Sequence, residues 1–277
     1  MSKTLLRGLD LIEVVGLHGP MTITELARRT GIDITIVSRT VSACEPDGWL
    51  ARVDGKIFAG PRCALLGLAS PASHAIRLAE PLVHAIAGAT GVATIASALV
   101  GHDVMVLASA IGSGPPLTVG ISSRVPIHVM ASGRAIAMQL PAEELTRLLP
   151  SEPYADADSV IDSLHIASPV TAFLASYQLS GGGASGVPRT RVELEADLSR
   201  SRTRGFAVDN GEVHPSIFCV AAPWPTAGLP ASISCIGNRD EITAQMHLIE
   251  DCLRTATQPG ATSHDIIQTA AAAPAAR

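Results

Sequence analysis

The spacing of hydrophobic residues near the start of the chain predicts two helices. Leu5 and Leu9 lie about one helical turn apart and begin an apolar stripe over residues 5–17, which a cluster of Gly, His and Pro residues ends. Thr22 and Glu25 follow with the spacing of a capping box, in which each side chain binds the backbone N–H of the other residue. A second, short helix is therefore expected to begin there.

A third helix, expected to begin after Asp33, divides into an apolar and a polar face. Its apolar positions, which we expect to be buried, are Ile34, Val37, Val41 and Cys44. The opposite face carries hydroxyl groups, one guanidinium and no acid, at Thr35, Ser38, Arg39 and Ser42. In the major groove of DNA, arginine pairs with guanine and hydroxyls reach bases or phosphates. The pattern thus favours DNA contact; the alternative is an ordinary surface helix whose polar side faces water.

A hairpin is predicted directly after the third helix. Residues 49–53 and 57–59 have the composition of strands, and Asp54-Gly55 between them is a strong signal for a two-residue turn. Arg52 and Lys56 flank this turn. Three helices followed by a basic hairpin are typical of a winged helix-turn-helix.

The rest of the chain predicts a linker and an α+β domain. Pro71 and Pro81 cannot lie comfortably inside a helix, so we expect a linker helix, a break, and then the first helix of a second domain. Further strands are expected at 92–99, 104–110, 117–121, 206–208, 217–222 and 231–236, and helices at 132–140, 191–204 and 239–257. The expected parts are a DNA-binding domain over 1–62, a linker helix over 63–80, a second domain over 81–258 and a mobile tail over 259–277.

Composition and charge exclude several classes of protein. No apolar run approaches the roughly 20 residues needed to cross a bilayer, and the start lacks a signal peptide, so a cytoplasmic location and no membrane partner are expected. The five cysteines are far apart and form no C-x-x-C pair, which argues against a disulfide framework or zinc ribbon. The net charge is −5, and the first seventy residues, with one basic residue in excess, are the part best able to approach a phosphate backbone.

Several motifs of the first domain resemble IclR-type bacterial transcriptional regulators. They are Gly8-Leu9-Asp10-Leu11-Ile12, Gly19-Pro20, Glu25-Leu26-Ala27, Gly31, Ser38-Arg39, Gly48-Trp49-Leu50 and Leu66-Gly67. The recognition helix of such proteins tends to carry more basic residues near its start, whereas residues 33–36 contain none. Phosphate contacts are therefore expected from Arg28, Arg29, Arg52 and Lys56.

The resemblance continues to about residue 257 through three further motifs, at 124–135, 204–212 and 219–223. It implies a GAF-like effector domain, in which a curved antiparallel sheet holds a small organic or aromatic acid. The positions that match ligand contacts in such proteins are Val125, Ala131, Ser132, Asp209, Cys219, Ser234 and Ile236. The resemblance also implies linker helices that contribute to a dimer contact, in a homodimer or a dimer of dimers that binds double-stranded operator DNA.

Simpler roles exist for three of these positions. Asp209 lies in a Val-Asp-Asn-Gly stretch with the composition of a turn, Cys219 fits a small buried filler, and Ser132 fits a helix cap. Glu212, His214, Asp209 and His128 do not have diagnostic metal-ligand spacing, so neither a metal nor another cofactor is expected.

The main rival class is an enzyme, and a protein-binding sensory module is the third. An enzyme would use Cys219 as nucleophile, with His214 or His128 as base and Asp209 as its orienting group. No catalytic motif accompanies these residue types, so no catalytic residue is predicted.

Overall fold

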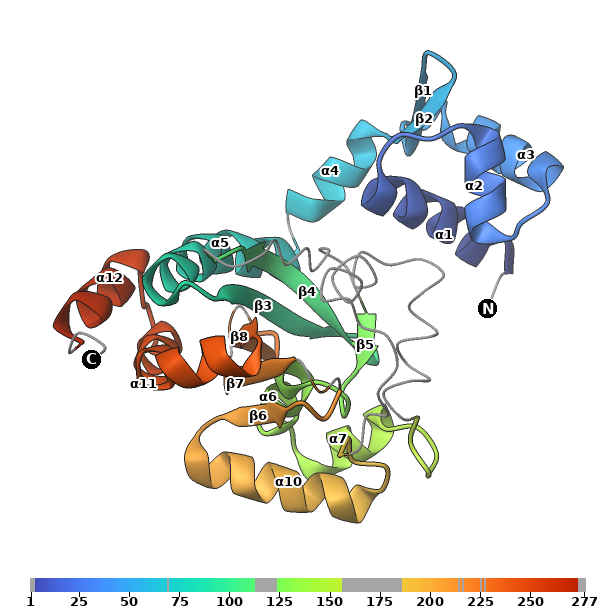
Figure 1. Ribbon diagram of the computed structural model, residues 1–277. Helices are drawn as coiled ribbons and strands as arrows, with labels where there is room; N and C mark the ends of the chain where they lie inside the picture. The colour runs from blue at the N-terminus through green and yellow to red at the C-terminus, as the bar shows by residue number, and fades with distance from the viewer. Residues whose placement is uncertain are drawn as a thin grey trace. The chain divides into compact units, whose positions relative to one another are not determined.

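The computed structural model describes residues 3–68, 70–112, 124–155, 186–213, 215, 217–224, 226 and 228–273. The chain forms two compact units, unit 1 over Met1–Ser73 and unit 2 over His74–Arg277 (Figure 1). The strand expected at 117–121 lies outside the described residues.

Unit 1 is a small helical body with a two-stranded hairpin. Its elements are α1 (Lys3–His18), α2 (Ile23–Thr30), α3 (Ile34–Cys44), β1 (Leu50–Val53), β2 (Lys56–Ala59) and α4 (Pro61–Leu68). Its core is a cluster of buried apolar side chains from α1, α2, α3 and both strands. The members of this cluster are Leu11, Val15, Met21, Leu26, Val37, Val41, Leu50 and Ile57.

Local signals account for the ends of these elements. The capping box at α2 is present: the Thr22 N–H donates to Glu25 Oε2 at 2.8 Å, and the Glu25 N–H donates to Thr22 Oγ1 at 3.2 Å. Asp33 caps α3 by accepting from the Thr35 N–H at 2.8 Å. In the hairpin turn, Asp54 and Gly55 both have positive φ, 50° and 75°, which matches the twist of the flanking antiparallel strands.

The expected burial of the first and third helices is wrong in part. Leu5 and Leu9, at the start of the predicted apolar stripe, are 60% and 51% exposed, whereas Val15 near its end is buried together with Leu11. Ile34, expected in the buried stripe of α3, is 47% exposed, since it stands at the first position of that helix, outside the layer formed by Val37 and Val41.

Unit 2 is built on a curled antiparallel sheet. Within the described residues the sheet has six strands in the order β5-β4-β3-β8-β7-β6. The strands are β3 (Ala93–Val100), β4 (Asp103–Ala110), β5 (Arg124–Pro126), β6 (Ala207–Asn210), β7 (Phe218–Pro223) and β8 (Ala231–Gly237). All neighbouring pairs are antiparallel. Five of the six further strands expected from the sequence therefore match β3, β4, β6, β7 and β8 within a few residues.

Helices cover both faces of this sheet (Figure 1). The helices are α5 (Pro71–Thr90), α6 (Ala131–Ala137), α7 (Ala142–Leu148), α10 (Arg191–Arg204), α11 (Arg239–Ala256) and α12 (Ser263–Ala272). Helices α5 and α11 pack on one face and form the larger core with it. Helix α6 packs on the opposite face against β3, β6, β7 and β8, with Ala131 and Ala135 in a second core cluster. The mixed α+β class expected from the sequence is confirmed.

Two expectations about helix limits differ from the structure. The expected break between two helices lies before Pro71, since α4 ends at Leu68 and α5 begins at Pro71, but α5 then continues through Pro81 without a second break. Pro81 and Arg77 both lie on the exposed side, so water can bind the Arg77 carbonyl that lacks an N–H donor, while Leu82 and Val83 hold the inner side in the core.

The segment 259–277, expected to be a mobile tail, contains helix α12. Thr262 and Asp265 form a capping box at its start, and Ile266 is fully buried in the core that includes α11.

Candidate functional sites

The polar side of α3 lies at the surface of unit 1. Thr35, Arg39 and Ser42 are exposed and Ser38 is half-buried, so none of the four predicted DNA contacts is part of the core. Residues 34–44 include no acid, and the carboxylate of Asp33 is held at the helix start by its hydrogen bond to the Thr35 N–H. The face is therefore accessible and compatible with a negatively charged surface.

The predicted phosphate contacts are exposed, and one of them is paired with an acid. Arg28 and Arg29 end α2, and Lys56 begins β2. Arg52 forms a two-pronged ion pair with Glu45, with Nε–Oε1 and Nη2–Oε2 separations of 3.1 Å and 3.4 Å. This pair has no local signal in the sequence, because Glu45 lies after the end of α3 and contacts the hairpin only in the folded chain. Arg52 is therefore less available to phosphate than the other cations.

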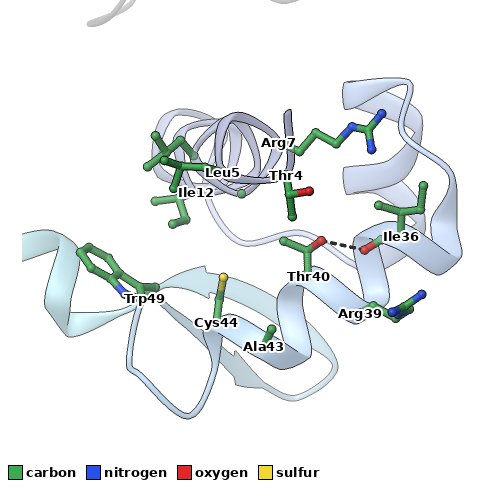
Figure 2. Close-up of a pocket in the computed structure, with 12 residues that line it drawn as sticks. Thr4, Leu5, Arg7, Ile12, Ile36, Arg39, Thr40, Ala43, Cys44 and Trp49 are labelled. Carbon is green, nitrogen blue, oxygen red and sulfur yellow. Dashed lines mark hydrogen bonds between the residues drawn. The ribbon is translucent and has the colours of Figure 1, made fainter. Parts of the chain in front are cut away.

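An apolar groove of about 780 Å³ runs between α1 and α3 in unit 1 (Figure 2). Its lining includes Leu5 and Leu9, the side chains that the hydrophobic pattern placed on one stripe of the first helix. Figure 2 shows the guanidinium groups of Arg7 and Arg39 extending to the same side of the groove, with Ile36 between them in this view. Sequence analysis missed Arg7, because only the packing of α1 on α3 brings it to the end of the groove where Arg39 lies.

Most predicted effector contacts meet on the sheet face beneath α6. Asp209, Cys219 and Ile236 are direct neighbours across β6, β7 and β8, and Ser234 lies two residues from Ile236 on the same face. Ala131 of α6 packs in one cluster with Cys219 and Ile236.

The remaining two predicted contacts lie at either side of the start of α6. Ser132 is in its first turn and is 8% exposed, while Val125 packs in a neighbouring cluster with Val129, Val187 and Val213. The helix begins at Ala131 with Met130 as its N-cap residue, so the interpretation of Ser132 as the helix cap is wrong.

Arg134 forms a buried ionic cluster at the edge of this face. Its side chain is 1% exposed, and its Nη atoms lie 2.6 Å from Glu212 Oε2 and 3.2 Å from Asp197 Oδ2. It also donates to the carbonyl oxygen of Val208 at 3.3 Å. Burial alone lowers the pKa of Arg134, but Glu212, Asp197 and Asp209 outweigh burial and raise it. Arg134 therefore stays charged and ties α6 to α10 and to the end of β6.

The sequence offered only weak signals for this cluster. Arg134 lies within the motif at 124–135, but the predicted site residues do not include it. Gly133 beside it is required by packing, because a Cβ at that position would lie 2.4 Å from the carbonyl oxygen of Ile127. A small residue followed by a cation inside an otherwise apolar helix is the signal that predicts such a buried charge.

Asp209 is almost completely buried, and it also closes the turn after β6. Its Oδ1 accepts from the Glu212 N–H at 2.7 Å, so the turn role and a place on the sheet face beneath α6 coexist. Burial raises the pKa of Asp209 to about 6, although Arg134 and backbone N–H groups oppose this rise.

The described residues of the enzyme hypothesis offer no activated nucleophile. Burial, reinforced by Asp209, raises the pKa of the Cys219 thiol far above its ordinary range, so it stays protonated. His128 bonds through Nε2 to the carbonyl oxygen of Ala155 at 3.2 Å and packs beside the Tyr154 ring, and burial lowers its pKa. His214 lies outside the described residues.

The part of the chain that the structure describes shows neither a cluster of metal ligands nor a membrane-spanning helix. The described residues contain no group of three or more His, Cys, Asp or Glu side chains placed to hold a metal ion. None of the described helices has the length and apolar character required to span a bilayer.

Comparison with known proteins supports one family. No family model matches the chain. The transcriptional repressor IclR of Escherichia coli K12 is 22% identical over 228 residues, which cover 79% of this chain and 73% of the repressor. This relative is a regulator of transcription, not an enzyme.

Solved structures with similar folds cover nearly the whole chain. An IclR homologue from Microbacterium hydrocarbonoxydans, complexed with 4-hydroxybenzoate, is 18% identical with a TM-score of 0.64 and covers 98% of this chain and 100% of its own. An IclR transcriptional regulator from Alicyclobacillus acidocaldarius is 18% identical with a TM-score of 0.63, covering 98% and 99%. The resemblance indicated by the motifs is thus confirmed: the chain is similar to an IclR repressor in sequence and has the fold of IclR-type transcriptional regulators.

Proposed function

We propose that this chain is a ligand-responsive transcriptional regulator of the IclR type. Unit 1 is proposed to act as a winged helix-turn-helix that binds double-stranded operator DNA, with α2 and α3 as the helix pair and β1–β2 as the wing. Unit 2 is proposed to act as a GAF-like domain that binds a small effector. The observation that carries the proposal is the exposed outer face of α3, which has hydroxyls and a guanidinium but no acid.

In the proposed complex, α3 lies in the major groove. Thr35, Ser38, Arg39 and Ser42 face base edges and nearby phosphates, while Arg28, Arg29 and Lys56 contact the backbone. Arg52 also contacts the backbone when its ion pair with Glu45 opens. The affinity that the wing contributes therefore depends on whether this ion pair is formed. Each unit 1 offers few cations, so useful affinity requires two such units bound together.

A homodimer, or a dimer of dimers, supplies the two DNA-binding units. The support lies in apolar side chains that unit 1 leaves at its surface. None of the eight residues of α4 is buried, and Leu65, Leu66 and Leu68 are 64%, 65% and 70% exposed. Covering the leucines of α4 with a second copy removes them from water.

The proposed effector is a small organic or aromatic acid, held on the sheet face beneath α6. Six of the seven predicted contact positions belong to α6 or to the strands it covers. The homologue complexed with 4-hydroxybenzoate supports an aromatic acid as one member of this class. Effector binding there favours one conformation of unit 2. A coupling free energy of about 1–3 kcal/mol between effector binding and DNA binding changes operator occupancy severalfold or more. We further propose that the protein acts in the cytoplasm, where operator DNA is accessible, and that it catalyses no reaction.

The test is a gel-shift titration with the intergenic DNA beside the gene, repeated over salt concentration and with candidate aromatic and organic acids. Arg39→Ala is expected to weaken DNA binding at least about fivefold, because an arginine–guanine contact is worth about 1–3 kcal/mol. The matched control is Arg147→Ala, an exposed arginine of unit 2, which should bind as the parent does. An absence of retardation at low ionic strength refutes DNA binding.

A further inference from the structure

We infer that Ile34 and Ile36 recognise thymine methyl groups, so that the operator half-site carries thymines where the start of α3 enters the major groove. This inference rests on the proposed function and adds to it a specificity that depends on methyl groups. Ile34 was expected in the core, and Ile36 was assigned no role.

The two side chains lie at the end of the helix that would meet the bases first. Ile34 and Ile36 are 47% and 38% exposed, on either side of Thr35, within the first turn of α3. In helices that enter the major groove, the residues of the first turns contact base edges. Two branched apolar side chains therefore occupy positions where polar or basic residues are usual.

The chemistry of this first turn leaves one kind of base contact. Between positions 34 and 36 the only hydrogen-bonding side chain is that of Thr35. An isoleucine side chain can contact a base edge only through apolar surface. In the major groove, the apolar mark that distinguishes one base pair from another is the C5-methyl group of thymine. The first turn of α3 thus adds recognition of thymine to the hydrogen-bonding contacts proposed for the rest of the helix.

The charged side chains near the first turn of α3 favour DNA, rather than an apolar protein surface, as its partner. Arg39 lies three residues after Ile36, and Arg7 lines the same groove as both of them (Figure 2). Residues 34–44 contain no acid; the N-cap carboxylate of Asp33 offsets the partial positive charge of the helix start, so Arg39 and Arg7 are the charges that favour DNA here. On this surface the isoleucines can contact thymine methyl groups in the major groove while the arginines on either side contact DNA nearby.

The geometry also locates the thymines. Three residues advance about 4.5 Å along a helix, and successive base pairs are about 3.4 Å apart. If Arg39 pairs with a guanine, the base pair that faces Ile36 lies one or two steps away. The expected half-site therefore has a thymine within one or two base pairs of a guanine.

The experiment replaces each thymine of the bound DNA by deoxyuridine, which removes only the methyl group. Affinity of the full-length protein is measured by fluorescence anisotropy for every substituted duplex. A contacted thymine should lose about fourfold in affinity when its methyl group is removed. Thymines outside the footprint serve as the control and should show no change.

Variants link the effect to the two isoleucines. Ile34→Ala and Ile36→Ala should each weaken binding of the thymine duplex by a similar factor, and should no longer distinguish thymine from deoxyuridine at one position. Ile267→Ala is the matched control, since Ile267 is 57% exposed on α12 of unit 2, and it should keep the full sensitivity. Circular dichroism checks that each variant is folded.

The outcomes separate this inference from the proposed function. Retardation of the DNA without any deoxyuridine-sensitive position overturns the inference but leaves DNA binding intact. Sensitivity that persists in both alanine variants also overturns it, because the methyl effect then comes from DNA shape or from other residues. If Ile36→Ala breaks up an oligomer and leaves methyl sensitivity unchanged, Ile36 is a protein contact. No retardation by any duplex refutes the proposed function itself.

Discussion

Replacement of Asp209 by asparagine should stabilise unit 2 at neutral pH. The Asp209 side chain is 1% exposed, and its Oδ1 accepts from the Glu212 N–H at 2.7 Å. An asparagine carbonyl can accept the same hydrogen bond at almost the same volume. The substitution therefore removes the buried negative charge while it keeps the turn after β6 closed.

The magnitude follows from the pKa of this carboxyl. Burial raises the pKa of Asp209 from 3.8 to about 6, in spite of Arg134. A carboxyl whose pKa is higher in the folded state favours folding while it is protonated, and this contribution is lost as pH rises from about 4 to about 6. The interval between 3.8 and about 6 corresponds to about 3 kcal/mol. Asp209→Asn should thus gain up to about 3 kcal/mol at pH ~7.5 and little at pH ~4.

The assay is urea unfolding of the parent and variant at both pH values. The chain has two tryptophans, Trp49 in unit 1 and Trp224 buried in the core of unit 2. In a Trp49→Phe background, the fluorescence of Trp224 reports unit 2 alone. Asp240→Asn, at an exposed position in the first turn of α11, is the matched control and should change stability little at either pH. A variant that is less stable by the same amount at both pH values refutes the reasoning.

Three further substitutions test other parts of the structure. Glu45→Ala should raise operator affinity severalfold in a gel shift, because it frees Arg52 from its ion pair. The salt dependence of binding should steepen by about one counterion, and the gain in affinity should vanish in an Arg52→Ala background. Gly133→Ala should destabilise unit 2 by about 1–3 kcal/mol in urea unfolding, because its Cβ would lie 2.4 Å from the Ile127 carbonyl oxygen. Cys219→Ser should change effector affinity, measured by calorimetry, and leave operator affinity unaltered.

Local chemistry made much of the fold predictable. The capping box of Thr22 and Glu25, the N-cap Asp33 and the Asp54-Gly55 turn each involve residues within four positions of one another, and each appears in the structure as expected. Such signals act over one turn, so neighbouring residues contain them completely. They located the ends of elements even where the burial of the same elements was misjudged.

Tertiary packing decided what the sequence could not. Periodicity places Leu5 and Leu9 on one stripe, but it cannot say whether that stripe or the one with Leu11 enters the core of unit 1. The penalty for Pro81 inside a helix depends on whether water can bind the freed carbonyl, which only the exposure of that side settles. Contacts between distant residues had at most a weak local signal, and the cluster around Arg134 is the clearest case.

The places where local rules fail coincide with the places to which we assign function. An exposed pair of isoleucines at the start of α3 and a buried carboxyl whose charge opposes folding both act against stability. Residues that lower stability are retained in a protein when its function requires them. The most direct such function is to bind a ligand that covers the apolar side chains or neutralises the buried charge. In the proposed function, DNA is that ligand for α3, and an acidic effector bound beneath α6 is that ligand for Asp209. If effector binding takes up a proton at Asp209, effector affinity should fall as pH rises from about 5 to about 7, whereas in Asp209→Asn it should be independent of pH over this range. Calorimetry in buffers of different ionisation enthalpy measures the proton uptake directly, and equal pH dependence in both proteins would remove Asp209 from the effector site.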